Sequence, residues 1–187
     1  MTTEAQLREL YAQPKERPLK KVMPALDVHS TSFIERSPFI TIATIDGNGN
    51  MDCSPKGGAP RFIKIVSPTQ IAIPDSRGNN RLDSLRNIVL DGRVSCMFLV
   101  PGSNNVVRVN GTAGVTLDED LRARFDDKGR MPRAVIVVRI GEVYSQCARA
   151  IMRANLWQGM ERVAVPSVGE MLAELKDGFD GTSYDAE

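Results

Sequence analysis

The segment best suited to bind a charged ligand is Pro74-Asp75-Ser76-Arg77-Gly78-Asn79-Asn80-Arg81, where the end of a strand leads into the start of a helix. Unpaired backbone amides at a helix start attract anions. The Ser76 hydroxyl and the guanidinium groups of Arg77 and Arg81 would add short, charge-assisted hydrogen bonds. The segment therefore predicts a phosphate site, although an ordinary capped loop with two solvated arginines fits the same residues.

A second cluster, Asp52-Cys53-Ser54-Pro55-Lys56-Gly57-Gly58, ends a strand with a cation followed by two glycines. Glycines let the backbone approach a flat ligand closely. If that ligand is a flavin, an ammonium group near its pyrimidine edge would stabilise the negative charge that develops on reduction. Lys56 is the candidate for this contact, and a surface lysine in a Gly-rich turn is the alternative.

Few other side chains offer reactive groups. The three cysteines, Cys53, Cys96 and Cys147, are widely separated and form no C-x-x-C pair, so we predict reduced thiols and no metal site. We expect Cys53 and Cys96 to pack in the interior and leave a redox role for Cys147 open. His29 is the only histidine, which disfavours His-based metal sites and Ser-His-Asp or Cys-His hydrolases. We expect it to lie on a helix face or at a cap.

Composition indicates one globular domain rather than two, with 187 residues, 42% hydrophobic and 25% charged. Lys and Arg number 24 against 23 Asp and Glu, so the positive field that gathers nucleic acid is missing and no such partner is predicted. No apolar stretch approaches the roughly 20 residues that cross a bilayer, and charges interrupt the first ten residues. We therefore expect a cytoplasmic protein without a membrane partner.

The elements that must position these residues are mostly strands. β-Branched runs bounded by Gly, Pro and Asn predict strands at residues 39–45, 51–54, 62–66, 70–73, 94–100, 106–117 and 134–144. The turn Asp46-Gly47-Asn48-Gly49 predicts a hairpin between the first two strands, and Ser67-Pro68-Thr69 joins the next pair. Antiparallel hairpins with few helical crossovers argue against a doubly wound parallel sheet. We predict a mainly β (α+β) fold in which the strands close into a small barrel.

Helices are predicted around this barrel. Residues 4–12 suit a short helix, and Asp27 is a candidate N-cap for a helix ending near Arg36. Residues 79–91 have helical spacing, with Asn79 or Asn80 as the cap and Gly92 just after the end. Further helices are predicted at 118–126, 148–160 and 167–176, the last with a Ser167–Glu170 capping box and a stop at Gly178. Residues 181–187 are predicted to be a solvated acidic tail.

The order of these motifs resembles the FMN-binding split-barrel superfamily of the pyridoxamine 5′-phosphate oxidase type, over about Phe39 to Trp157. The resemblance is carried by the strand pair Phe39–Ile45 and Asp52–Gly57, the loop Ser76-Arg77-Gly78-Asn79, and Val106-Val107-Arg108-Val109-Asn110-Gly111, which is similar to the family's R-Q-V-R-x-x-G strand. It implies an antiparallel Greek-key split barrel over residues 37–160, with a helical extension at 1–36 and a C-terminal helix and acidic tail at 161–187.

The resemblance also implies a homodimer with FMN in the groove between two barrels. The residues expected to hold the flavin from one subunit are Ser54, Lys56, Pro74, Asp75, Ser76, Arg77, Asn80 and Arg81. Those near Asn105, Val106 and Arg108 are expected to face the cofactor held by the other subunit.

The stretch from Tyr144 to Trp157 resembles the C-x-K-A-x-x-R-x-x-L-W ending of a subgroup of flavin-dependent enzymes of unassigned activity. Arg149 and Arg153 are four residues apart, so one helix face would present both to a phosphate or a carboxylate. Solvated arginines, and a helix-packing role for Trp157, are the alternatives. We take Cys147, Arg149, Arg153 and Trp157 as candidate substrate-site residues.

The resemblance implies an FMN-dependent oxidoreductase acting on an unknown small molecule, with the flavin supplying the hydride chemistry and no side chain needed as a nucleophile. True pyridoxamine 5′-phosphate oxidases hold the vitamin phosphate with an Arg and a His near the C-terminus. No histidine follows His29 here, so vitamin oxidation is not expected. Two alternatives stay open: a non-catalytic flavin or heme carrier or redox sensor, and a deazaflavin (F420)-dependent reductase.

Overall fold

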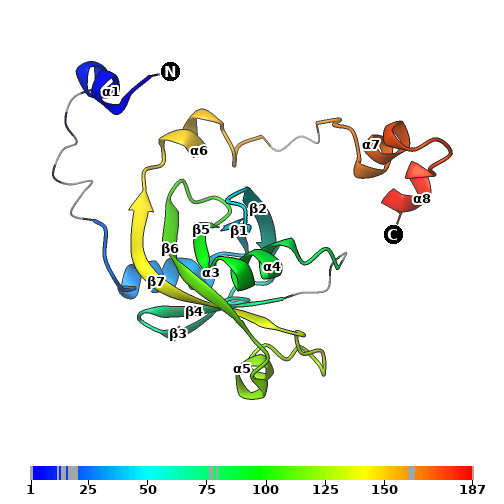
Figure 1. Cartoon of the computed structure of the whole chain (residues 1–187), viewed down its shortest axis with the longest axis horizontal. Helices are drawn as coiled ribbons and strands as arrows, with labels where there is room; N and C mark the ends of the chain where they lie inside the picture. The colour runs from blue at the N-terminus through cyan, green and yellow to red at the C-terminus, as the bar shows by residue number, and fades with distance from the viewer. Residues whose placement is uncertain are drawn as a thin grey trace. The chain divides into compact units, whose positions relative to one another are not determined.

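The computed structural model of the chain describes residues 2–11, 13, 16, 21–75, 78, 80–159 and 163–186. The chain divides into two compact units, residues 1–154 and 155–187. The first unit contains the sheet and the helices around it, and the second contains two short helices (Figure 1).

One seven-stranded antiparallel sheet forms the first unit, with the strand order β2-β1-β5-β6-β7-β4-β3. The strands are β1 (Phe39–Ile45), β2 (Met51–Gly57), β3 (Lys64–Ser67), β4 (Gln70–Pro74), β5 (Arg93–Leu99), β6 (Val106–Thr116) and β7 (Val135–Gln146). All seven predicted strands are confirmed, as is the mainly antiparallel β class. The largest differences are at β2, which continues to Gly57, and at β3, which begins at Lys64.

The sheet has an inner face that forms the core and an outer face that is more open. On β1, Ile40, Ile42 and Thr44 are buried, whereas the alternate residues are partly or fully accessible. Register extends this alternation across the sheet, because Ile40 is opposite both Lys56 of β2 and Phe98 of β5. Figure 1 shows β6 and β7 as long, bent strands, which lets the sheet curl around the inner face.

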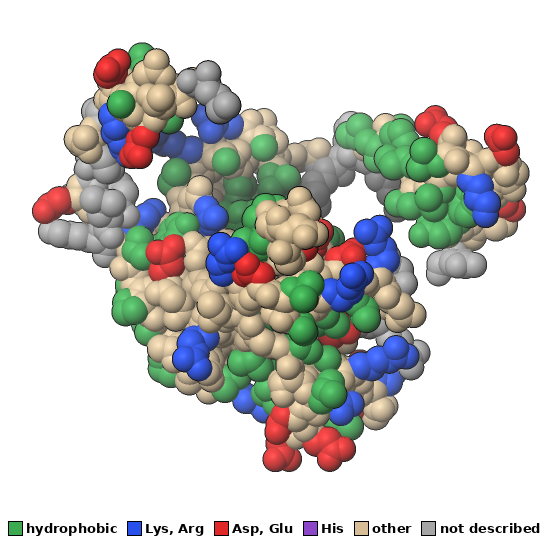
Figure 2. All heavy atoms as spheres, viewed as in Figure 1, with side chains coloured by type: hydrophobic (Ala, Val, Ile, Leu, Met, Phe, Trp, Pro, Cys, Tyr) green, Lys and Arg blue, Asp and Glu red, His purple; other side chains and the backbone are tan. Residues whose placement is uncertain are grey.

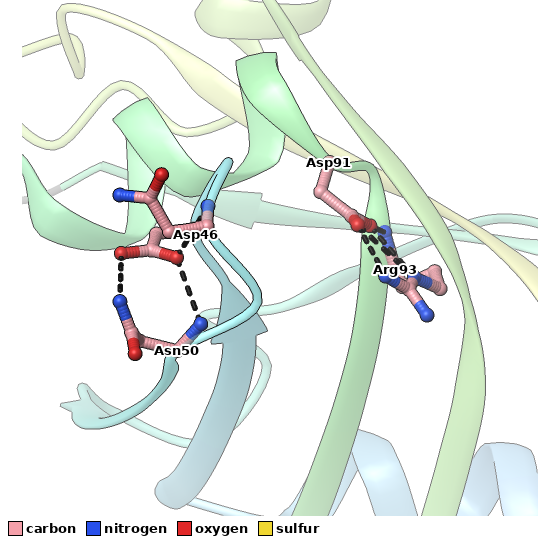
Figure 3. A network of polar contacts seen from close by, with 5 residues as sticks. Asp46, Asn50, Asp91 and Arg93 are labelled. Carbon is pink, nitrogen blue, oxygen red and sulfur yellow. Dashed lines mark hydrogen bonds and ion pairs between the residues drawn. The ribbon is translucent and has the colours of Figure 1, made fainter.

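Two aspartates fix the connections at one end of the sheet (Figure 3). Asp46 accepts hydrogen bonds from the backbone amides of Asn48 and Asn50, both at 2.8 Å, and from the Asn50 side chain, which lowers the pKa of Asp46. This confirms the predicted β1–β2 hairpin. Asp91 binds the guanidinium of Arg93, with Nε 2.9 Å from Oδ1, and the Arg93 hydrogen bonds lower the pKa of Asp91 to about 2.

β2 is an edge strand of this sheet, because its only ladder partner is β1. Pro55 lies in the middle of β2, opposite Thr41. Proline has no backbone N–H and is tolerated in a sheet at such an edge.

Helices of the first unit are α1 (Glu4–Leu10), α3 (Val28–Arg36), α4 (Asp83–Leu90), α5 (Glu119–Ala123) and α6 (Arg149–Arg153). Asp27 caps α3 through a capping box with Ser30, as predicted for the cap. α4 packs against β1, and the buried Asn87 side chain donates a hydrogen bond of 3.0 Å to Thr44 Oγ1. α4, α5 and α6 are shorter than predicted. Among the described residues no helix is both long and apolar enough to cross a bilayer.

The predicted cap of α4 is wrong. The N-cap is Leu82, which has φ 60° and makes no side-chain capping hydrogen bond, and Asn80 also has φ 60°. These two left-handed residues reorient the chain immediately before the helix, so α4 begins at Asp83. Asn79 lies outside the described residues.

The second unit pairs α7 (Val168–Leu175) with α8 (Gly181–Asp185). The predicted Ser167–Glu170 capping box is confirmed. Residues 182–186 of the predicted solvated acidic tail are exposed, but the prediction missed that residues 181–185 are helical and that Asp185 accepts a hydrogen bond of 2.9 Å from the Gly169 amide. Figure 2 shows apolar side chains over α7, where Val168, Met171 and Leu175 are exposed.

Candidate functional site

Lys56 and Asp75 meet at the opening of the barrel. Lys56 Nζ lies 4.0 Å from Asp75 Oδ1, and the two side chains are only 19% and 20% exposed. Lys56 is near the end of β2 on the inner face, and Asp75 directly follows β4. β2 is one edge strand and β4 lies next to the other edge strand, β3, so the ion pair joins opposite ends of the strand order.

The flanking residues Ser54 and Pro74 are held by the same strands. Ser54 has the inner-face register of Lys56, and its hydroxyl donates a hydrogen bond of 2.9 Å to Asp52 Oδ2. Pro74 ends β4 opposite Val135, and the Asp75 amide donates to the Ala134 carbonyl at 3.0 Å. The two strand ends therefore fix where Lys56 and Asp75 can meet.

The predicted phosphate loop is described only in part. Ser76 and Arg77, its central candidates, lie outside the described residues. Asn80 is exposed, and Arg81 Nε lies 2.9 Å from Asp83 Oδ2 with the Arg81 side chain 73% exposed. The N-cap residue of α4, Leu82, offers no side-chain acceptor to the first backbone amides of the helix. Such amides suit a bound anion.

The remaining cofactor candidates lie on β6, where Val106 and Arg108 have the outer-face register, or directly before it. Asn105 is exposed directly before β6, and Val106 begins that strand. Arg108 is opposite Met97 of β5 and Tyr144 of β7, and its guanidinium Cζ lies 5.6 Å from the centre of the Tyr144 ring. Within one chain, the sheet therefore separates Arg108 from Lys56, since the two side chains have registers on opposite faces.

The substrate candidates lie around α6. Cys147 is exposed at the junction between β7 and α6, and Arg149 and Arg153 are exposed at the two ends of α6. Trp157 belongs to the second unit, beyond the end of α6. The structure thus places Cys147, Arg149 and Arg153 close together in sequence on α6 and the junction before it. The role of these three residues and Trp157 in a substrate site stays a prediction.

Sequence reasoning missed a polar chain on the outer face. Ser95 Oγ donates to Asn110 Oδ1 at 2.6 Å, and Asn110 Nδ2 donates to Glu142 Oε1 at 2.6 Å. The three residues are cross-strand partners on β5, β6 and β7. The available signal was a polar residue at an alternate position of each strand, but it becomes a network only once the strand order is known.

The three thiols differ in accessibility. Cys96 is buried, as predicted, and burial raises its pKa to about 12. Cys53 is exposed, so the prediction that it packs in the interior is wrong. Its register places it on the outer face of the edge strand β2, a position that depends on strand order rather than on local sequence.

We expect two of the three cysteines to react with a chromogenic disulfide reagent at pH 8 in the native protein. Cys53 and Cys147 are exposed, whereas the Cys96 thiol stays protonated and enclosed. Counting the released chromophore before and after denaturation measures this directly. Cys53→Ser and Cys147→Ser should each remove one native equivalent, and rapid native reaction of all three thiols would contradict the expectation.

The family model described as pyridoxamine 5′-phosphate oxidase matches residues 27–147, which span β1 to β7. The chain belongs to the pyridoxamine 5′-phosphate oxidase family. Family membership and fold agree with the resemblance and identify the seven-stranded sheet as a split barrel.

Solved structures of low sequence identity share this fold. HupZ of Group A Streptococcus is 16% identical with a TM-score of 0.55, and the match covers 65% of this chain and 94% of HupZ. A candidate pyridoxamine 5′-phosphate oxidase of Lactobacillus delbrueckii is 24% identical with a TM-score of 0.51, over 65% of this chain and 95% of that protein. No curated protein sequence matches the chain. At these identities the solved structures show the fold alone.

Proposed function

We propose that this family member is an FMN-dependent oxidoreductase that works as a homodimer on a small-molecule substrate. The observation that carries the proposal is the Lys56–Asp75 pair, held across the opening of the barrel by the ends of β2 and β4. The loop that follows Asp75 leads to the N-terminus of α4, which lacks a side-chain cap. A cation at the end of β2 and a loop that leads into a helix N-terminus fit a ligand that has both an electron-accepting ring and a phosphate.

The phosphate of FMN is assigned to the loop before α4. Ser76, Arg77 and the first amides of α4 would donate hydrogen bonds to it, together with Asn80 and Arg81. Arg81 is mostly exposed where it pairs with Asp83. An exposed ion pair of this kind contributes little free energy.

Lys56 is assigned to the ring. Bound FMN would supply the hydride chemistry, and the protein supplies the charge that tunes it. The Lys56 ammonium is largely shielded from water and oriented by Asp75, and it would donate a hydrogen bond to the pyrimidine edge, where negative charge develops on reduction. The backbone of β2 near Ser54 would lie along the ring.

A second copy of the chain would complete the site. Asn105, Val106 and Arg108 lie on or beside the outer face, whereas Lys56 has the inner-face register. If all of them contact one flavin, the outer-face residues must come from the partner. Cys147, Arg149, Arg153 and Trp157 are our candidates for contacts with the substrate.

The test is a pair of titrations with FMN and riboflavin, followed by flavin absorbance and fluorescence. We expect FMN to bind at least tenfold more tightly than riboflavin, because only FMN carries the phosphate that the loop recognises. The spectrum of the purified protein separates a bound flavin from a deazaflavin or heme. A protein that binds neither flavin at micromolar concentration contradicts the proposal, and bound FMN that no nicotinamide donor reduces at a useful rate indicates a carrier.

A further inference from the structure

A groove of about 320 Å³ lies on the outer face of the sheet, on the opposite side from Lys56. Ala43 of β1 and Ser95 of β5 are cross-strand partners and both line it. Because these two side chains are small, they form the floor of the groove. Ile45 and Met51 add an apolar wall, so the groove can receive an apolar group.

Arg108 gives this groove a positive charge. Both Arg93 and Arg108 line the groove, and none of the described residues that line it carries a carboxylate. Asp91 compensates the charge of Arg93. The Oδ2 atom of Asp91 lies 2.5 Å from the Nη2 atom of Arg93. Within the described part of the chain, no hydrogen bond or ion pair engages the Arg108 side chain, and its guanidinium lies over the Tyr144 ring. A half-buried guanidinium in this state can still donate hydrogen bonds to an anion.

The polar chain Ser95–Asn110–Glu142 lies beside Arg108 on the outer face. Glu142 and Tyr144 lie two residues apart on β7, so they share the outer face with Arg108. Asn110 donates to Glu142 Oε1 and accepts from Ser95, which commits both ends of its amide. The nearest acidic side chain on β7 is thus bound to Asn110, and it forms no ion pair with Arg108.

We propose that this groove binds a small organic anion with an apolar body, with Arg108 as its anion-binding residue and Tyr144 as a positioning residue. The apolar body would lie against Ala43, Ile45 and Met51 while the carboxylate or phosphate pairs with Arg108. Tyr144 acts through Arg108, because the Arg108 guanidinium lies over the Tyr144 ring and this contact limits the directions in which the guanidinium can point. The assignment of this anion as the enzyme's substrate rests on the proposed function, in which Arg108 faces the flavin of a second copy.

Calorimetric titration of the full chain with benzoate and with benzyl alcohol tests the groove. The two probes share an aromatic body, and only benzoate is charged. We expect benzoate to bind at least tenfold more tightly. Arg108→Gln should abolish this preference, whereas Arg139→Gln, at an exposed arginine elsewhere on β7, should leave it unchanged. Equal binding of the two probes, or benzoate affinity unchanged in Arg108→Gln, overturns the proposal.

The role of Tyr144 has its own readout. Tyr144→Phe keeps an aromatic face under Arg108 and should hold benzoate affinity within about twofold, whereas Tyr144→Leu should weaken it about fivefold or more. In the double variant Arg108→Gln/Tyr144→Leu the leucine should have no additional effect, because Tyr144 acts only through Arg108. Additive losses, or equal losses with Phe and Leu, would show that Tyr144 has only a packing role.

Titrations with and without FMN keep the two proposals separable. Benzoate binding that depends on Arg108 in a protein that does not bind FMN would support the groove and contradict the flavin assignment. Tight FMN binding without any benzoate binding up to 10 mM would support the flavin and overturn the groove.

Discussion

Lys56→Glu is expected to weaken FMN binding on the order of 100-fold, or about 2.7 kcal/mol. The substitution removes the ammonium that faces Asp75 and places a second carboxylate beside it in a largely shielded position. The reduced flavin carries negative charge, so its binding should weaken more than that of the oxidised form and the midpoint potential of any bound flavin should fall. Flavin titration and redox titration of the variant measure the two effects.

Two control variants show whether the loss of FMN affinity in Lys56→Glu depends on the position of residue 56 or only on the change in net charge. Lys56→Arg keeps a cation at the end of β2 and should retain FMN binding within about tenfold. Lys128→Glu makes the same charge change at an exposed residue in the turn before β7 and should leave binding unchanged. Equal losses in Lys56→Glu and Lys128→Glu would indicate a general electrostatic effect and remove Lys56 from the site.

Phe98→Ala is expected to lower the free energy of unfolding by roughly 3–5 kcal/mol. Phe98 is completely buried on β5, among the inner-face residues of β1 and β6. Its removal would leave a cavity enclosed on several sides by strands, which can collapse only in part. Urea unfolding followed by circular dichroism measures the change in stability.

The matched control is Val89→Ala on α4. Val89 is 74% exposed, so its truncation should change stability by less than about 0.5 kcal/mol. A Phe98→Ala protein as stable as the native chain would mean that β5 does not carry the core described above.

Sequence patterns predicted the local parts of the fold well. The bounds of β1 were correct because a Gly- and Asn-rich turn and regular alternation mark its ends and its inner face. The caps at Asp27 and Ser167 were correct because a capping side chain and its partner lie three residues apart. The start of α4 was missed because it depends on the left-handed backbone conformation of Leu82. Leucine is not a residue type that predicts this conformation from sequence.

Non-local contacts explain what the sequence left undetermined. The helix at 181–185 packs through Asp185 on the Gly169 amide, a contact between residues far apart in the chain. The exposure of Cys53 follows from the edge position of β2, and the meeting of Lys56 with Asp75 requires the sheet to curl. The candidate residues themselves could be named from the sequence, but their distribution over two faces of one sheet could not.

Pro55 has a consequence for how this molecule behaves when crowded. A neighbouring chain that added a strand along β2 would find an interrupted row of donors, because proline offers no N–H. Edge-to-edge addition of strands along β2 is therefore disfavoured. Proline at this edge thus lowers the tendency of the folded protein to aggregate by strand addition along β2.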